Sequence, residues 1–357
     1  MAARMKDIAR DLGVSLMTVS KALRNHSDIS PETRSRVLKR ARDLHYEPNW
    51  IARSLVTRRT YMVGLVIPDL MHSFFAEVAK GVARKVEPLG YQIVISNSEE
   101  NIEAEQRQIA LLLSRNVDGL IVASTQPTGR TRLFKALRSR KIPYVLIDRM
   151  PAGLEAHYVG VKDDEIGVLA TEHLIGQGCC RIAHIRGPAL SNGTGRLRGY
   201  RRALAKHGIQ PPPEYIVSAQ SDSSGYEAMR RLLRASPRPD GVFCYNDPTA
   251  AGAIQAVLDA GLNVPHDVAI VGAGNVHYSD LLRVPLSTVD QSSSLIGETA
   301  AELLAECMEA RTQIAAKRVL IPPRLIIRES SLRQGRESAS AQEAAPENRY
   351  IPERLTH

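Results

Sequence analysis

The sequence is poor in the features that mark secreted, membrane-spanning or metal-binding proteins. Its 357 residues include only four cysteines, at 179, 180, 244 and 307, which are too few and too scattered for a disulfide framework or a zinc site. No apolar run approaches the ~20 residues that a membrane span needs, and the first residues lack the uninterrupted apolar stretch of a secretory signal. These absences predict a cytoplasmic protein without membrane contact, metal or other cofactor.

Aromatic residues are also scarce, at 4% of the chain, so aliphatic side chains must build most of the core. The length suggests two or three domains. The net charge of +9 is concentrated at one end: residues 1–60 hold 13 Lys and Arg against 6 Asp and Glu, whereas the remaining residues hold 34 against 32. This distribution is typical of a small nucleic-acid-binding module joined to a nearly neutral domain, although a basic solvated tail would produce it too.

The first 60 residues show helical periodicity without a β-rich run. Apolar residues recur at helical spacing over 6–12 and again over 16–23. A third helix is expected from residue 31 to 44, because Ser30 suits an N-cap, a proline follows at the first helical position, and the first turn is acidic.

From residue 61 onward, strand-like and helical segments alternate. Strands are expected at 62–67, 92–96, 119–123, 144–147, 182–185, 241–244 and 268–271. Helices are expected at 76–89, 103–113, 131–138, 167–175, 199–207, 226–233, 249–260 and 295–308, and an apolar segment follows at 319–327. Strict alternation predicts parallel sheets with helices on both faces, and the length favours two doubly wound lobes, with four strands before about residue 150 and three after it.

Residues 5–24 carry the pattern of a helix-turn-helix. The motif needs a small residue where its helices pack, a glycine at the turn and apolar residues between the helices, and Ala9, Gly13 and Val19 supply them at the expected offsets. An ordinary pair of antiparallel helices is the alternative, which the basic charge of this region disfavours. The second helix would expose side chains suited to phosphates, base edges and thymine methyls: Ser15, Leu16, Met17, Thr18, Ser20 and Lys21.

The segments KDIARDLGVSLMTVSKAL, SPETRSRV and LHYEPNWIARSL, followed by the α/β pattern from Tyr61, resemble the LacI–GalR family of repressors over roughly residues 5–330. The resemblance implies an all-α helix-turn-helix headpiece at 1–46, a hinge helix and linker at 47–60, and a two-lobed α/β domain at 61–332. That domain would resemble periplasmic sugar-binding proteins, bind a small-molecule effector and dimerise, and the polar residues 333–357 would form a disordered tail. The expected function is that of a homodimeric repressor bound to pseudo-palindromic, double-stranded operator DNA.

The same resemblance assigns DNA contacts residue by residue. Base contacts fall on Leu16, Met17 and Lys21, and phosphate contacts fall on Ser15, Thr18 and Ser20. The following loop contributes Arg24, where the family usually has asparagine, and Asn25.

The hinge segment also has an argument from helix formation. A helix of about two turns is marginal in water, so residues 49–56 can be coil without DNA and helix on DNA. In the family, two such helices pair in the minor groove and a leucine wedges into a base step. The resemblance assigns the wedge to Leu55 and neighbouring contacts to Asn49, Ala52 and Arg53. The alternative is that Leu55 is a linker residue that packs on the core domain.

Several polar residues follow expected strands, where ligands of open α/β sheets bind. The first strand is followed by Asp69 and then by Phe74 and Phe75, and RGPALSNGTGRLRGY matches a family pattern that places Arg196 on the effector-binding arginine. Relatives often show an aromatic ring at the position of Gln220, and Gly-aromatic-Asp where this chain has Gly272-Ala273-Gly274-Asn275. The expected effector site is Asp69, Phe74, Phe75, Arg196, Gln220, Asn246, Asp247 and Gly274, with a sugar as the first expectation and a nucleobase as the second. Each of these residues alone could equally cap a loop.

Two other functions suit the α/β pattern less well. A nicotinamide-dependent enzyme would need a third glycine after Gly272-x-Gly274, but His277 stands there, and the sequence holds no G-x-S-x-G elbow, H-E-x-x-H or phosphate-binding loop. A solute-binding transport protein would need a secretory signal and no basic helix-turn-helix. Salt-dependent retention on DNA would separate a regulator from both, and we expect no enzymatic activity.

Overall fold

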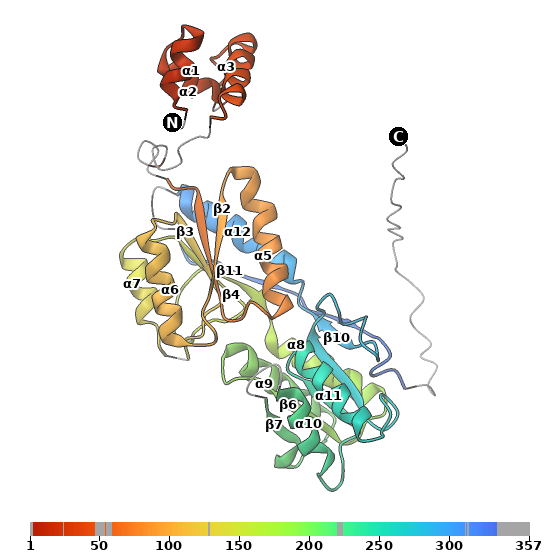
Figure 1. Ribbon diagram of the computed structural model, residues 1–357. Helices are drawn as coiled ribbons and strands as arrows, with labels where there is room; N and C mark the ends of the chain where they lie inside the picture. Colours follow the sequence, from red (N-terminus) through yellow and green to blue (C-terminus); the bar gives the residue numbers. More distant parts are fainter. Residues whose placement is uncertain are drawn as a thin grey trace, which may run out of the picture.

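The computed structural model describes residues 3–23, 25–46, 54, 59–127, 129–219, 224–310, 312 and 314–333. A small helical module (residues 3–46, the headpiece) precedes a large α/β region that is divided into two lobes (Figure 1). None of the helices in these ranges is long and apolar enough to cross a membrane. The predicted hinge at 47–60 and the predicted tail from 333 fall largely outside the described residues, so these domain limits stay predictions.

Three helices build the headpiece: α1 (Met5–Leu12), α2 (Leu16–Leu23) and α3 (Pro31–Asp43). Gly13 ends α1 in the left-handed conformation, with φ of 64°, and the Val14 amide then donates to the Ala9 carbonyl at 3.1 Å. A turn this tight directs α2 across α1. Ile8 and Val19 are fully buried between the helices, as the helix-turn-helix pattern predicts.

The N-terminal lobe is a six-stranded parallel sheet with helices on both faces. Its strands, in spatial order, are β11 (Arg318–Ile321), β5 (Tyr158–Val161), β4 (Tyr144–Ile147), β3 (Gly119–Val122), β1 (Met62–Ile67) and β2 (Gln92–Asn97). Its helices are α5 (Ser73–Val86), the 3₁₀ turn η1 (Glu87–Leu89), α6 (Ile102–Ser114), α7 (Arg132–Ser139) and α12 (Ser293–Glu309). Alternate residues of β1 are buried on opposite faces, Val63 and Leu65 toward α5 and α12 and Val66 toward α6 and α7.

The C-terminal lobe repeats this plan, with one antiparallel strand at the sheet edge. Its strands, in spatial order, are β12 (Arg324–Ile326), β10 (Ser287–Asp290), β9 (Ala269–Gly274), β8 (Gly241–Cys244), β6 (Ile182–Arg186) and β7 (Ile216–Ser218). Its helices are α8 (Asp163–Gly176), α9 (Ser191–Lys206), the 3₁₀ turn η2 (Pro213–Tyr215), α10 (Gly225–Leu233) and α11 (Asp247–Asp259). β12 runs antiparallel to β10. The predicted class, a helix-turn-helix with two doubly wound lobes, is confirmed.

The chain passes between the lobes three times, not once near residue 150 as the strand pattern suggested. It leaves the N-terminal lobe between β5 and α8, returns between β10 and α12, and leaves again between β11 and β12. The apolar segment expected at 319–327 is therefore two strands in different sheets, separated by Pro322 and Pro323, which cannot donate backbone hydrogen bonds. These three crossings together connect the lobes, and we call them the interlobe connection to distinguish them from the hinge segment at 47–60.

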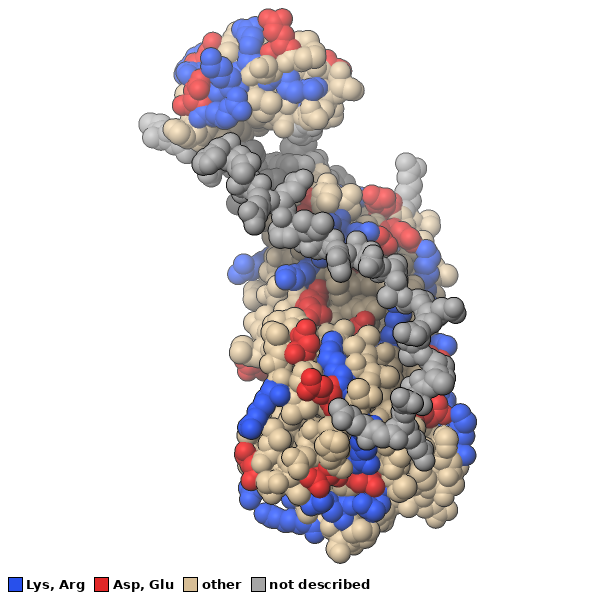
Figure 2. Space-filling model, turned by 90° about the vertical axis from the view of Figure 1, so that its right-hand side faces the viewer, with Lys and Arg blue, Asp and Glu red and all other residues tan. Residues whose placement is uncertain are grey.

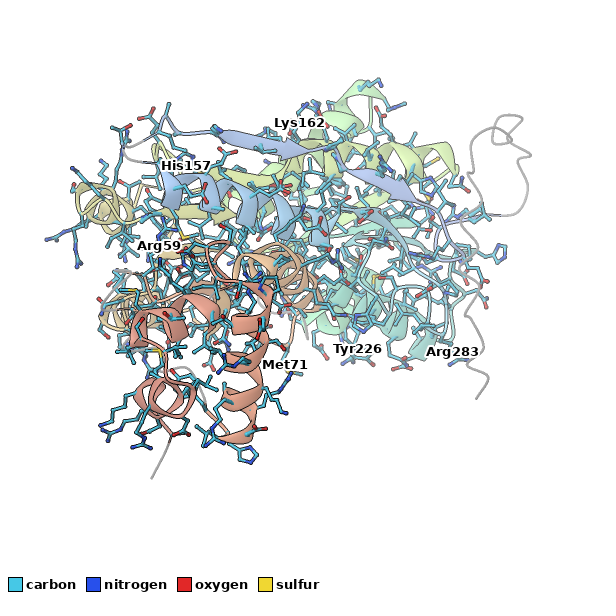
Figure 3. The ribbon with its side chains drawn as sticks, turned by 90° about the horizontal axis from the view of Figure 1, so that it is seen from above. Arg59, Met71, His157, Lys162, Tyr226 and Arg283 are labelled. Atoms are coloured by element: carbon cyan, nitrogen blue, oxygen red, sulfur yellow. The ribbon has the colours of Figure 1, made fainter. Side chains whose placement is uncertain are left out.

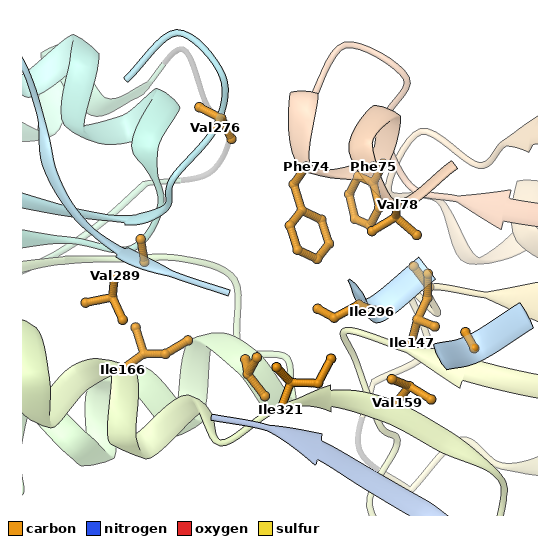
Figure 4. Packing of buried hydrophobic residues seen from close by; sticks show 14 of the residues in the cluster. Phe74, Phe75, Val78, Ile147, Val159, Ile166, Val276, Val289, Ile296 and Ile321 are labelled. Carbon is orange, nitrogen blue, oxygen red and sulfur yellow. The ribbon is translucent and has the colours of Figure 1, made fainter. Parts of the chain in front are cut away.

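Buried hydrophobic side chains from both lobes form one cluster where the lobes meet (Figure 4). Phe74 and Ile296 come from the N-terminal lobe, and Ile166 and Val289 come from the C-terminal lobe. The shared cluster holds the facing edges of the lobes near each other.

Candidate nucleic-acid interface and ligand cleft

The exposed face of α2 carries the residues expected to meet DNA bases. The side chains of Leu16 and Met17 are 51% and 62% exposed, although both are large and apolar. On the opposite face, Val19 and Ala22 are buried against the rest of the headpiece. Exposed apolar side chains of this size suit contact with thymine methyls in a DNA groove.

The N-terminus of α2 is capped by the hydroxyl group of Ser15, the residue that precedes the helix. The Ser15 hydroxyl oxygen accepts a hydrogen bond from the Thr18 amide at 3.0 Å and lies 2.8 Å from the Thr18 hydroxyl. This cap stabilises the N-terminus of the helix, whose positive end favours phosphate groups. Both residues therefore combine a structural role with a position suited to the DNA backbone.

Lys21 lies one turn further along α2 and forms an ion pair with Asp28. The hydrogen bond from Lys21 lowers the pKa of the Asp28 carboxyl below its ordinary value. Ser20 is half-buried, and Asn25 is exposed with φ of 56°. Figure 2 shows Lys and Arg side chains over the headpiece, with acidic side chains between them. The remaining predicted contacts, Arg24, Asn49, Ala52, Arg53 and Leu55, lie outside the described residues.

A cleft of about 490 Å³ opens between the two lobes, at the carboxyl ends of their strands. Five predicted effector residues line it: Asp69, Phe74, Phe75, Arg196 and Asn246. The sequence patterns did not point to the other polar residues of its lining, among them His72, Asp148, Arg149, Asn192 and Gln291. Asp148 and Arg149 directly follow β4, so the rule that ligands bind beyond strand ends could have found them. Gln291 lies on the crossing from β10 to α12, which the sequence pattern did not predict.

Arg196 is 2% exposed and joins three segments of the cleft wall. Its guanidinium donates to the Tyr245 carbonyl at 2.6 Å, to Gln291 Oε1 at 2.8 Å and to Asp163 Oδ1 at 3.2 Å. It also lies 5.1 Å from the centre of the Tyr245 ring. Burial raises the pKa of Asp163 to about 7, although the Arg196 charge acts in the opposite direction. Arg196 is thus a fixed part of the C-terminal wall.

Arg149 is fixed in a similar way on the N-terminal side. Its two terminal nitrogens each lie 2.7 Å from an oxygen of Glu100, a fork-to-fork pair. Its Nε lies 3.2 Å from Asp148 Oδ2. Only 5% of Arg149 is exposed, so the cleft has a second guanidinium that is already neutralised by carboxylates.

Hydrogen bonds between described residues connect the lobes across the cleft. Asn192 Nδ2 donates to Asp148 Oδ2 at 3.1 Å, and the Met150 amide donates to Ser191 Oγ at 2.9 Å. His72 Nε2 lies 3.2 Å from Asn246 Nδ2. Because these groups belong to opposite lobes, each bond stabilises a closed arrangement of the cleft.

The other predicted effector residues lie away from the cleft lining or outside the described structure. Asp247 is fully buried, and its carboxylate accepts hydrogen bonds from the Val276 amide at 3.0 Å and the Ser279 and Thr288 hydroxyls at 2.8 and 2.5 Å. Burial raises the pKa of Asp247, and these three donors lower it. Gly274 has φ of 143° and follows Ala273, which lines the cleft. Gln220 is outside the described residues.

The cleft chemistry suits hydroxyl groups better than charges. Four carboxylates, of Asp69, Glu99, Glu100 and Asp148, face two guanidinium groups in its lining. Carboxylates accept hydrogen bonds, guanidinium groups donate them and amides do both, so together they match a ligand rich in hydroxyls. Among the described residues, no group of three or more His, Cys, Asp or Glu could hold a metal ion.

An exposed helix-turn-helix surface and a ligand-sized cleft between two lobes define a ligand-responsive, DNA-binding regulator. Residues 4–49 match the lacI family of bacterial regulatory proteins, and residues 171–331 match the periplasmic binding protein-like domain. The chain is 32% identical to catabolite control protein A of Priestia megaterium over 91% of this chain and 98% of that protein. It is 33% identical to the ribose operon repressor of Escherichia coli K12 over 92% of this chain and 100% of that protein.

Solved structures of full-length regulators have the same fold. The complex of the transcriptional regulator CelR with cellobiose has a TM-score of 0.69 at 29% identity, covering 92% of this chain and 99% of that one. The lac repressor dimer bound to operator and the anti-inducer ONPF has a TM-score of 0.82 at 24% identity, a likeness of fold, covering 93% and 100%. The chain belongs to the lacI family of bacterial regulatory proteins. It is a DNA-binding transcriptional regulator, and its relatives are repressors rather than enzymes.

Proposed function

We propose that this protein is a repressor without enzymatic activity, whose affinity for operator DNA is controlled by an uncharged sugar held between the lobes. The observation that carries the proposal is the cleft of about 490 Å³. This volume is in the range of small-molecule sites, and its polar groups are fixed before any ligand arrives. Two relatives support a sugar by their descriptions, one named for the ribose operon and one solved with cellobiose.

The charges of the cleft favour an uncharged ligand. Arg149 is already paired with Glu100, and the guanidinium of Arg196 already donates hydrogen bonds to Asp163, Gln291 and the Tyr245 carbonyl. A phosphate or carboxylate would therefore meet Asp69, Glu99 and other acidic groups without a free guanidinium to offset the repulsion. A neutral hydroxyl group can hydrogen-bond to these residues without that cost.

On the DNA side, we assign base contacts to Leu16, Met17 and Lys21 and backbone contacts to Ser15, Thr18 and Ser20. Two copies of the chain would bind a pseudo-palindromic operator, since a two-fold dimer matches two half-sites. The lac repressor dimer on its operator supports this arrangement through the shared fold.

The experiment is a selection of bound sites from random DNA, followed by a screen for metabolites that change affinity for the selected site. The panel contains neutral monosaccharides and disaccharides, their phosphates and free nucleobases. We expect a neutral sugar to act and its phosphate to act at least tenfold more weakly. Arg149→Gln should abolish the response, and Arg202→Gln, at a surface ion pair with Asp164, should leave it unchanged. A response restricted to phosphates or nucleobases would overturn the ligand class.

A further inference from the structure

A second cavity, of about 370 Å³, lies in the N-terminal lobe and shares no lining residue with the cleft. It is built where β4 and β5 begin and where α7 and α12 end, and Tyr144, Arg138 and Cys307 belong to its lining. The cleft lies at the opposite, carboxyl ends of the same strands. A ligand in the second cavity would therefore be separated from the cleft by the whole sheet.

Tyr144 belongs to the polar part of the lining of this cavity. The side chain is buried, with 7% of the residue exposed, and no residue in the described ranges forms a hydrogen bond with its hydroxyl. Burial raises the pKa of Tyr144 to about 12, so the hydroxyl keeps its proton and is available as a donor. The hydroxyl oxygen is not among the fully buried, unpartnered polar atoms of the described residues, so water reaches it, and a ligand acceptor would replace that water.

A second donor in the lining is the imidazole of His157. Its Nδ1 accepts a hydrogen bond from the Lys317 amide at 3.2 Å, so the ring proton is on Nε2. Burial and the nearby Lys317 lower the pKa of His157, which favours this neutral form.

The charged groups at the cavity are mainly basic. Arg138 is paired with Glu155 at 3.1 Å, whereas Lys141 is exposed and forms no ion pair with any residue that the structure describes. Most of the remaining lining is apolar, with Ile142, Ala156 and Ile314 among its members and Thr312 as a polar exception. Uncompensated positive charge, two donors and an apolar wall are complementary to an anion with a hydrocarbon portion.

We propose that this cavity is a second ligand site, which binds a small organic carboxylate. The carboxylate accepts a hydrogen bond from the Tyr144 hydroxyl and is attracted to the Lys141 ammonium group. The hydrocarbon portion packs on Ile142 and Ile314. The volume accommodates an acid with a short chain or a single ring.

The end of α12 connects this site to the segment that leads to the headpiece. Cys307 lines the cavity, and the next residue, Met308, offers its carbonyl to Arg59 Nη2 at 3.3 Å. Arg59 also lies 3.5 Å from the Tyr91 hydroxyl. Figure 3 labels Arg59 and His157, which lie in the same lobe near α12. A ligand that contacts the end of α12 would thus alter operator affinity without passing through the cleft.

The experiment uses the full chain and three acids, benzoate, 3-phenylpropionate and hexanoate, each matched by its neutral alcohol. N-ethylmaleimide alkylation is followed separately by mass spectrometry at Cys307, which lines the cavity, and at the exposed Cys180 in the other lobe. We expect at least one acid to slow alkylation of Cys307 severalfold more than its alcohol does, and to leave Cys180 unchanged. Equal effects of acids and alcohols at Cys307, or no effect, would overturn the site.

Variants then test the chemistry of the site. Tyr144→Phe keeps the ring and removes one hydrogen bond to a charged acceptor, so the dissociation constant of the acid should rise roughly tenfold or more. Lys141→Gln should also weaken the acid but not the alcohol, and Tyr226→Phe, in the C-terminal lobe, should change neither. Unchanged affinity in both cavity variants would overturn the assignment.

A last experiment distinguishes the effect of a ligand in this cavity from the effect of a ligand in the cleft. The acid should change operator affinity equally in the wild type and in Arg149→Gln, which lacks one of the two arginines of the cleft. Binding of the acid without any change in operator affinity would overturn the connection through α12 and Arg59, whatever the cleft binds.

Discussion

Asp163 shows how a single buried carboxyl supports the cleft wall from behind. It contacts Arg196, and burial raises its pKa to about 7, from an ordinary value of 3.8. Because the folded-state pKa is raised, the folded protein holds this proton more tightly than the unfolded chain does. The contribution of Asp163 to stability is therefore lost as the pH rises from about 4 through about 7.

We expect Asp163→Asn to become more stable relative to the wild type as the pH rises from 5 to 8, by roughly 2–3 kcal/mol, because asparagine does not titrate. Urea unfolding followed by circular dichroism at several pH values measures this difference. Asp164→Asn, at the neighbouring position, is the matched control and should show a flatter dependence. A difference that stays constant or falls with pH would contradict the raised pKa.

Met17 and Thr18 are adjacent on α2 but differ in their environment. Met17 is 62% exposed, and the Thr18 hydroxyl lies beside the capping Ser15. Met17→Ala should change which operator bases are preferred, at a cost of about 1–3 kcal/mol for a lost base contact. Thr18→Ala should weaken all sites more evenly, since backbone contacts position the protein without specifying sequence. Selection from random DNA with each variant measures both effects, and an unchanged base preference for Met17→Ala would remove it from the base contacts.

Helices α5 and α12 approach each other at a pair of glycines. A Cβ on Gly297 would lie 2.1 Å from the Val78 carbonyl oxygen, and a Cβ on Gly81 would lie 2.1 Å from the Ser294 carbonyl oxygen. Both obstacles are backbone atoms, which cannot rotate away. The two helices, distant in sequence, can therefore lie together on one face of the sheet only because these positions have no side chain.

We expect Gly297→Ala to destabilise the N-terminal lobe by roughly 1–3 kcal/mol or more, because the helices must separate to admit a methyl group. Thermal or urea unfolding measures the loss. Gly176→Ala, at the end of α8, is a suitable control because a Cβ there meets no atom within 4 Å. That variant should be neutral or slightly more stable. A stable Gly297→Ala protein would show that the helix contact is adjustable.

Sequence patterns predicted most of the buried apolar strands, but they did not predict β5, β7 or β10. β1 and β8 are continuous apolar runs and were expected at their observed bounds. β10, with the residues Ser-Thr-Val-Asp, and the three-residue β7 lack such a run, and their place in the sheet depends on partners distant in sequence. β12 lies within the expected apolar segment at 319–327, but the pattern did not separate it from β11. The same limit applies to the site: Asn246 follows a recognisable strand, whereas Gln291 enters the cleft only through a crossing between lobes. Asp247 shares the strand-end pattern, but its carboxylate is directed into the lobe by three donors that no local pattern reveals.

At the scale of the whole molecule, the cleft and the DNA surface are distant. The proposed sugar would therefore control DNA binding only through the arrangement of the lobes. The three crossings allow the lobes to move relative to each other, and the bond between Asn192 and Asp148 holds them together on the cleft side. A ligand that prefers one arrangement shifts the population toward it. Operator DNA, which would bind the headpieces of the proposed dimer, must then prefer one arrangement as well.

Such coupling is reciprocal by thermodynamic necessity. The factor by which the sugar changes operator affinity should equal the factor by which operator DNA changes sugar affinity, typically about 5–150-fold. Fluorescence anisotropy of labelled operator and calorimetric titration of the sugar, with and without operator, measure the two factors. Asn192→Ala should reduce both factors together, because it removes a bond between the lobes, while Asn263→Ala, on the surface of the C-terminal lobe, should leave both unchanged. If the two factors differ beyond experimental error, the sugar and the operator do not act on one shared equilibrium. If Asn192→Ala leaves both factors unchanged, the coupling depends on contacts other than the hydrogen bond between Asn192 and Asp148.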